Sequence, residues 1–237
     1  MKYNLIITIL FLANNLFCQN NNQNIKFPPV TMTNFVEFND SKFNNPIAGC
    51  SFLVATIKDT FAVTCKHALW VAKSDEMKCI SFENTLKQWR MQRKDDTTKY
   101  VITDKLLNEN KNELIGEENV NSDYLVFSIR ENHSDVKPLK LRTTGLEENE
   151  TLFIVGWTFQ DRIGEQRIYE VKYVKSLANK ILVEMPALNL AGTSGSPVLD
   201  KNGLLVGIVS NYTQDAETQK WYGSPCNTNY LMKIVND

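Results

Sequence analysis

Residues 191–211, AGTSGSPVLDKNGLLVGIVSN, join a glycine-rich turn to two short apolar runs. Two glycines in the turn bracket Ser194, and a proline opens the first apolar run, PVLD (197–200). The second run, LLVGIVSN (204–211), begins after a polar turn that ends in glycine. Glycine allows tight backbone angles and the close approach of another backbone, so this turn is able to present a serine hydroxyl outward. The segment predicts two β-strands preceded by an exposed serine.

The rest of the chain continues this pattern of short apolar runs separated by polar turns. No helical period appears before the last residues, NTNYLMKIVND (227–237), which predict a short terminal helix. Many short strands with turn signals between them predict an all-β sandwich or barrel. The further strand candidates are GCSFLVAT (49–56), TFAVTCKH (60–67), KCISF (78–82), TKYVIT (98–103), DYLVFSI (123–129), TLFIVGW (151–157), QRIYEVKYV (166–174) and KILVEMP (180–186).

The N-terminus has the pattern of an export signal. A lysine follows Met1, and residues 5–13 (LIITILFLA) form an apolar stretch in which Thr8 is the only polar residue. This run is too short to span a bilayer, which takes about 20 residues, and its length suits the core of a signal peptide. We therefore expect a signal peptide over 1–18, an Asn- and Pro-rich extended arm over 19–46, and one domain over 47–237. The mature protein would be secreted or periplasmic.

Composition and net charge limit the classes of binding partner that are expected. The chain is 43% hydrophobic, and 26 basic residues against 27 acidic ones give a net charge of −1. Such a balance does not favour binding to nucleic acid or to an anionic membrane surface. With only two histidines and no zinc-like spacing, neither a metal nor another cofactor is expected. The sequence leaves the oligomeric state unknown.

Four cysteines would remain after removal of the signal peptide: Cys50, Cys65, Cys79 and Cys226. In an exported protein they allow two disulfides with three possible connectivities, and free buried thiols are the alternative. Cys50 and Cys65 are candidates to face one another across a hairpin.

The turn around Ser194 is either a plain connection between strands or the position of a nucleophile. A serine hydroxyl becomes a good nucleophile only when an adjacent base accepts its proton. His67 ends an apolar run, whereas His133 lies in a polar loop. A carboxylate has to orient the base. Asp123 stands directly before an apolar run, and Asp104 is the competing choice.

Three segments, in the order His, Asp, Ser, resemble the motifs of the chymotrypsin-like (trypsin-like) serine peptidases, and especially their bacterial Deg-type and glutamyl-endopeptidase-like branches. The segment 64–67 (TCKH) looks like the family's T-A-A-H, and 122–126 (SDYLV) looks like its D-[IL]-A-L. The segment 192–197 (GTSGSP) looks like G-[DN]-S-G-[GS]-P. The resemblance spans about residues 47–212.

This resemblance implies two six-stranded antiparallel Greek-key β-barrels, over about 47–130 and 145–225, with the active site in the cleft between them. It also implies a secreted serine endopeptidase that hydrolyses protein or peptide substrates. His67, Asp123 and Ser194 would form the catalytic triad, and the backbone N–H groups of Gly192 and Ser194 would form the oxyanion hole.

By the same resemblance, the pocket for the side chain before the scissile bond would be lined by Leu188, Asn189, Leu190, Val209, Ser210 and Asn211. These residues include no acid, which disfavours a preference for Lys or Arg, and no histidine follows Ser194, which disfavours a preference for Glu. The substrate is therefore expected to carry a small or apolar side chain directly before the scissile bond.

Two departures from the family pattern stand out. Thr193 replaces the aspartate that receives the freed N-terminal amine in trypsin, so that activation switch is not expected. Lys66 replaces a small residue beside the base, and we expect its side chain to point to solvent. Two other functions stay open: a catalytically idle binding module of the same fold, or an esterase that uses the same triad.

Overall fold

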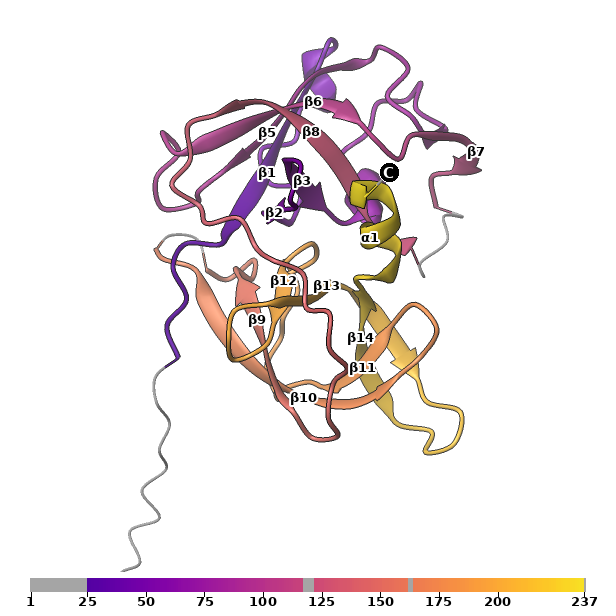
Figure 1. Ribbon diagram of the computed structural model, residues 1–237. Coiled ribbons are helices and arrows are strands. Elements are labelled where there is room, and N and C mark those ends of the chain that lie inside the picture. Colours follow the sequence, from indigo (N-terminus) through magenta and orange to yellow (C-terminus); the bar gives the residue numbers. More distant parts are fainter. Residues whose placement is uncertain (1–24, 117–121, 162–163, 237) are drawn as a thin grey trace, which may run out of the picture.

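The computed structural model describes residues 25–116, 122–161 and 164–236, so the predicted signal peptide lies outside the described residues. Two closed antiparallel barrels lie one above the other, and helix α1 (Asn229–Asn236) lies beside their junction (Figure 1). The predicted fold class, all-β with two six-stranded barrels and a short C-terminal helix, is confirmed.

The first barrel holds its strands in the spatial order β1-β2-β3-β8-β6-β5. Alternate side chains of each strand point inward, as β-geometry requires, and the largest buried ones include Trp89, Phe52 and Phe127. The strands are β1 (Thr31–Phe38), β2 (Cys50–Ala55), β3 (Thr60–Thr64), β5 (Leu86–Gln92), β6 (Tyr100–Leu106) and β8 (Leu125–Asn132).

This barrel begins earlier in the chain than the sequence predicted. Strand β1 lies within residues 19–46, which we expected to form an extended arm, and it pairs with both β2 and β5. Its Met32 and Val36 are fully buried. The side-chain amide of Asn34 donates to the carbonyls of Ala48 and Cys50, so a polar residue of β1 is satisfied inside the barrel. The Asn-rich composition around β1 is not typical of a barrel strand, and for this reason the strand was not predicted from the sequence.

The second barrel has the order β10-β11-β14-β13-β12-β9 and a smaller apolar core of its own. Its strands are β9 (Thr151–Gly156), β10 (Arg167–Ser176), β11 (Ile181–Glu184), β12 (Pro197–Leu199), β13 (Leu205–Gln214) and β14 (Trp221–Asn227). The two strands predicted from the opening segment are present, and β12 pairs with β13. The connection before β12 carries Ser194 to the junction.

A two-stranded sheet, β4 (Cys79–Ile80) with β7 (Asn110–Leu114), lies against the side of the first barrel. Strand β7 lies outside the strand candidates identified from the sequence. Two short 3-10 helices, Ser41–Phe43 and Lys66–Trp70, complete the first half of the chain.

The barrels meet through apolar packing and a few buried hydrogen bonds. The main core cluster includes residues of both barrels, for example Phe153 and Ile208 beside the first-barrel side chains. Across the junction, Thr31 Oγ1 donates to the carbonyl of Val155 at 2.6 Å. The hydroxyl of the fully buried Tyr124 donates to the carbonyl of Cys226 at 3.0 Å. These bonds fix how the two barrels present their loops to each other.

Candidate active site

His67 lies just after β3, in the 3-10 helix Lys66–Trp70. The pairing of β3 with β8 sets Thr64 opposite Leu125, which brings the segment after β3 close to Asp123. His67 then donates its backbone N–H to Asp123 Oδ1 at 2.9 Å, and its Nδ1 lies 2.6 Å from Asp123 Oδ2. The carboxylate therefore fixes both the backbone and the ring of His67.

Asp123 is 1% exposed, yet its carboxylate is well satisfied by hydrogen bonds. Ser210 Oγ, from β13 of the second barrel, also donates to Asp123 Oδ2. Burial acts to raise the pKa of Asp123, but the hydrogen bond and positive charge of His67 outweigh it, so this pKa is lowered. The aspartate is thus held as a carboxylate by groups from both barrels.

The pKa of His67 shifts in the opposite direction to that of Asp123. Burial acts to lower the pKa of His67, but its contacts with Cys65 and Asp123 outweigh burial and raise this pKa above its usual value. Cys65 Sγ is 3.7 Å from His67 Nε2, the nitrogen that does not face the aspartate. A buried thiol therefore contacts the nitrogen that a catalytic base would use.

Ser194 lies at the tip of the turn before β12, pressed against the first barrel. Its carbonyl accepts a hydrogen bond from the Cys50 backbone N–H at 2.7 Å. A Cβ on Gly195 would lie 2.2 Å from the Cys50 carbonyl, and one on Gly49 would lie 2.8 Å from the Ser194 carbonyl. Only glycine allows this approach, and Gly195 also has a φ of 81°. The glycines read from the sequence are explained by contact between the barrels.

The same contact brings the serine turn close to the segment that carries His67. A Cβ on Gly195 would lie 2.9 Å from Thr64 Oγ1, three residues before the histidine. Among the described residues, Ser194 Oγ makes no hydrogen bond with His67, whose Nε2 contacts Cys65 instead. Catalytic hydrogen bonds are often long without substrate and tighten when it binds.

The backbone around Ser194 leaves two amides available. Gly192 has a φ of 104°, again a conformation that favours glycine. The N–H groups of Thr193 and Gly195 are bonded to the carbonyls of Leu190 and Val209, both at 3.0 Å. In the part of the chain that the structure describes, the amides of Gly192 and Ser194 have no hydrogen-bond partner. Free amides of this kind can bind an oxyanion.

A pocket of about 150 Å³ lies beside Ser194. Five of the six residues predicted to line it do so, whereas Leu188 is 63% exposed and is not part of the lining. Sequence reasoning missed Met185, whose sulfur covers the backbone of Gly223 so closely that a Cβ there would lie 2.4 Å from it. The lining is Ile154, Met185, Asn189, Leu190, Ala191, Thr193, Ser194, Val209, Ser210, Asn211, Tyr212, Gly223, Ser224 and Pro225, which contains no charged side chain.

Lys66 does not point to solvent, as we had expected: its side chain is 0% exposed. Its ammonium lies 2.6 Å from Glu113 Oε1 on β7 and 3.4 Å from the hydroxyl of Ser122. It also lies 5.7 Å from the ring centre of Tyr230 on α1. The sheet β4–β7 and helix α1 cover this lysine, and neither was assigned to this position from the sequence. Lys66 and Ser122 are the chain neighbours of His67 and Asp123.

The competing candidates lie elsewhere. The ring of His133 is 53% exposed and contacts Glu131 and Tyr100. Asp104 Oδ2 lies 3.5 Å from Ser128 Oγ at an exposed position. Neither belongs to the group formed by His67, Asp123 and Ser210.

The cysteines Cys50, Cys65, Cys79 and Cys226 are all buried and free. Of the two alternatives that the sequence left open, the structure has free thiols rather than disulfides. The described residues contain no cluster of three or more His, Cys, Asp or Glu side chains suited to a metal ion. Nor does the described part contain a helix with the length and apolar character needed to cross a membrane.

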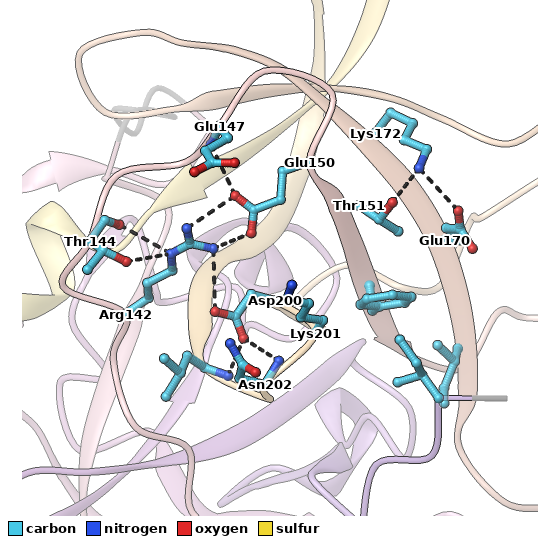
Figure 2. A pocket seen from close by; sticks show the side chains of 14 residues that line it. Arg142, Thr144, Glu147, Glu150, Thr151, Glu170, Lys172, Asp200, Lys201 and Asn202 are labelled. Carbon is cyan, nitrogen blue, oxygen red and sulfur yellow. Dashed lines mark hydrogen bonds and ion pairs between the residues drawn. The ribbon is translucent and has the colours of Figure 1, made fainter. Parts of the chain in front are cut away.

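A cavity of about 890 Å³ lies on the second barrel and does not include Ser194 (Figure 2). Arg142 is at its centre, with Glu150 bound to its guanidinium by two contacts and Asp200 Oδ2 3.4 Å away. Lys172 contacts Thr151 and Glu170 on the opposite wall. Charged side chains of both signs line this cavity, so it presents no single charge to a ligand.

Two antiparallel barrels with a buried His–Asp pair and a glycine-bracketed serine at their junction define the chymotrypsin-like class of hydrolase folds. The chain belongs to the trypsin-like peptidase domain family, whose model matches residues 50–208. The comparison with curated protein sequences finds no match.

Solved structures with the same fold are proteases of low sequence identity. A protease of M. tuberculosis in its active form has a TM-score of 0.57 at 10% identity, over 88% of this chain and 80% of that one. A serine endoprotease from Yersinia pestis has a TM-score of 0.55 at 13% identity, over 88% and 62%, so this chain spans less than two thirds of it. Kallikrein-related peptidase 10 in complex with Zn²⁺ has a TM-score of 0.58 at 12% identity, over 88% and 94%. At these identities the likeness concerns the fold alone.

Proposed function

We propose that this trypsin-like protein is a serine endopeptidase that uses Ser194 as nucleophile, His67 as base and Asp123 as the group that orients the base. One observation carries the proposal: His67 and Asp123 form a buried, doubly bonded pair, and Ser210 from the other barrel completes it. A merely structural histidine does not need two bonds to one carboxylate.

The proposed reaction is acyl transfer. Ser194 Oγ attacks the peptide carbonyl while His67 Nε2 accepts its proton, and His67 then gives that proton to the leaving amine. The free amides of Gly192 and Ser194 hold the oxyanion of the tetrahedral intermediate. Asp123 stabilises the imidazolium, and water then releases the acyl group. For this, Nε2 has to exchange its contact with Cys65 for one with Ser194.

The side chain before the scissile bond is proposed to be small or apolar. The pocket beside Ser194 has a volume of about 150 Å³ and no charged lining residue. A buried charge without a partner is costly, so this pocket disfavours Lys, Arg, Asp and Glu. Its apolar lining residues include Met185, Val209 and Pro225.

Export is a separate part of the proposal. It is supported by the apolar run at residues 5–13 and the basic residue before it. Expression of the full chain in a bacterial host, followed by N-terminal sequencing of the exported protein, is expected to show a new N-terminus close to Cys18. Retention of Met1 on a protein found only in the cytosol would contradict export and leave the enzymatic proposal intact.

Labelling with a fluorophosphonate probe tests the enzymatic proposal. We expect rapid labelling of the wild-type protein and none of Ser194→Ala, because the probe reacts only with an activated serine. Cleavage of casein then distinguishes a peptidase from an esterase, which would hydrolyse only a p-nitrophenyl ester. A folded wild-type protein that is not labelled would favour the idle binding module.

A further inference from the structure

Two large apolar side chains lie exposed beside the turn that carries Ser194, one on each barrel. Ile47 is 53% exposed and Phe159 is 66% exposed. A third, Trp70, is 53% exposed, and its ring lies 5.3 Å from the ring of His67. Single exposed apolar residues are common, but several around one site indicate a binding surface.

Backbone contacts place the first two beside the serine turn. Ile47 lies two residues before Gly49, where a Cβ would be only 2.8 Å from the Ser194 carbonyl oxygen. On the other side, a Cβ on Gly192 would be 2.5 Å from the backbone nitrogen of Phe159. Ile47 and Phe159 therefore flank the same short turn from opposite barrels.

The loop that carries Ile47 is held in place by the side chain of Asn45. Asn45 Oδ1 accepts the N–H of Ile47 at 3.0 Å, and its Nδ2 donates to the carbonyl of Val71, also at 3.0 Å. Val71 is 65% exposed and follows Trp70 directly. One asparagine thus fixes the apolar residues of two loops around the candidate active site, so they form a preformed surface.

This surface is separate from the pocket for the acyl group. None of Ile47, Trp70 and Phe159 lines the pocket that contains Met185 and Val209. A peptide that passes Ser194 has an acyl side and an amine side, and the departing amine has to reach His67 to receive its proton. Trp70 lies against His67, so the apolar surface faces the amine side.

We propose that Ile47 and Phe159, with Trp70 beside them, form a subsite for apolar side chains in the first two residues after the scissile bond. The proposal rests on the proposed peptidase activity and adds to it a preference on the leaving-group side. The substrate class is a peptide with an apolar residue directly C-terminal to the cleaved bond. Burial of such a side chain between two apolar residues is favourable.

Acyl transfer to added dipeptides tests this subsite directly. An ester of a small acyl group forms the acyl-enzyme and releases its alcohol. A dipeptide amide then attacks: its nitrogen bonds to the acyl carbon, the bond to Ser194 Oγ breaks, and the amine proton returns to Ser194 through His67. The ratio of transfer product to hydrolysed acid, measured by chromatography, gives the efficiency with which each dipeptide captures the acyl group.

We expect Leu-Leu amide to capture the acyl group about tenfold more efficiently than Gly-Gly amide, and Asp-Asp amide to be the poorest. Ile47→Ala and Phe159→Ala are each expected to reduce the ratio of Leu-Leu to Gly-Gly capture. Ile47→Lys is expected to favour Asp-Asp over Leu-Leu. Ile57→Ala removes another fully exposed isoleucine, at the β2–β3 turn, and is expected to leave the ratio unchanged.

The capture ratio compares acceptors on one protein sample, so the fraction of folded enzyme cancels. Ester hydrolysis with equal capture of all three dipeptides would overturn the subsite and leave the peptidase proposal standing. So would a Leu-Leu preference that survives in both alanine variants. Absence of any ester hydrolysis or acyl transfer in the wild-type protein would overturn the proposed function and the subsite together.

Discussion

The two barrels contribute to the candidate active site in different ways. The first barrel supplies ionisable side chains, His67 and Asp123, and the chain neighbour of His67, Lys66, forms an ion pair with Glu113. The second supplies mostly backbone and apolar surface, namely the turn around Ser194 and the uncharged pocket beside it. Substitutions of the first barrel's ionisable residues should therefore change the reaction rate or the stability, whereas substitutions in the second barrel's pocket should change substrate choice.

The largest effect in this comparison is expected from Asp123→Asn. Loss of the carboxylate leaves His67 in the wrong tautomer and removes its charge stabilisation, which in this type of triad lowers kcat by about 10⁴. The ratio of kcat/KM values for two small side chains before the scissile bond should stay the same. Asp104→Asn is the matched control, and steady-state kinetics on peptide substrates measure both. A normal kcat in Asp123→Asn would mean that another carboxylate serves the base.

Lys66→Met is expected to have the next largest effect, through stability. Removing one partner of a fully buried ion pair costs about 3–5 kcal/mol in the free energy of unfolding, and we expect about 3 kcal/mol here because Glu113 is 17% exposed and keeps its contact with Asn110. Urea denaturation measures this loss. The double variant Lys66→Met/Glu113→Gln should recover part of it.

Lys87→Met serves as the control for that substitution, since the Lys87 side chain is 63% exposed in its pair with Glu37. An exposed pair of this kind contributes at most about 1 kcal/mol. Equal unfolding free energies for the Lys66 and Lys87 variants would show that Lys66 is not a buried support of the first barrel.

Met185→Ala is expected to change selectivity rather than rate. The sulfur of Met185 covers the backbone of Gly223, so its removal enlarges the pocket beside Ser194. Substrates with Leu or Phe before the scissile bond should gain about tenfold in kcat/KM relative to those with Ala. Competition between peptides in one reaction measures this. Trp221→Ala, an exposed residue of β14 outside the pocket lining, should leave the ratio unaltered.

The smallest effect concerns the pH dependence of activity and Cys65. The contact of Cys65 Sγ with His67 Nε2 helps to raise the pKa of His67, so Cys65→Ala should lower that pKa. A base with a lower pKa is unprotonated at lower pH, and the acidic limb of the kcat/KM profile should move toward lower pH. Cys79→Ala, a buried cysteine on β4, is the control. A shift toward higher pH, or none, would mean that the thiol does not act on the base.

Much of the fold could be predicted from local patterns. Short apolar runs and turns indicated the barrels, and the runs around β2, β3, β8 and β12–β13 correspond to observed strands. β1 and β5 were missed because their polar residues are satisfied inside the barrel: Trp89 Nε1, for example, donates to Asn34 Oδ1 at 3.0 Å. No local pattern reveals that an asparagine will find such a partner far along the chain.

The candidate site likewise contains residues that the sequence motifs predicted and residues that only the structure revealed. Motif residues identified His67, Asp123 and Ser194 as candidates, and the structure brings the first two into direct contact. It also gives roles that no motif indicated: Ser210 bonds to Asp123, and Met185 closes the pocket. The burial of Lys66 reversed our expectation, since a lysine beside a histidine motif carries no sign of which element will cover it.

The sequence alone determined which chemical groups are present and in what order: the glycine-bracketed serine, the histidine at a strand end and the alternating apolar runs. Tertiary structure alone decided which of those groups meet. Contacts between residues far apart in the chain, such as the Cys50 amide with the Ser194 carbonyl, depend on how the two barrels pack. Packing depends on the whole buried surface at once, and therefore no single segment of the sequence encodes it.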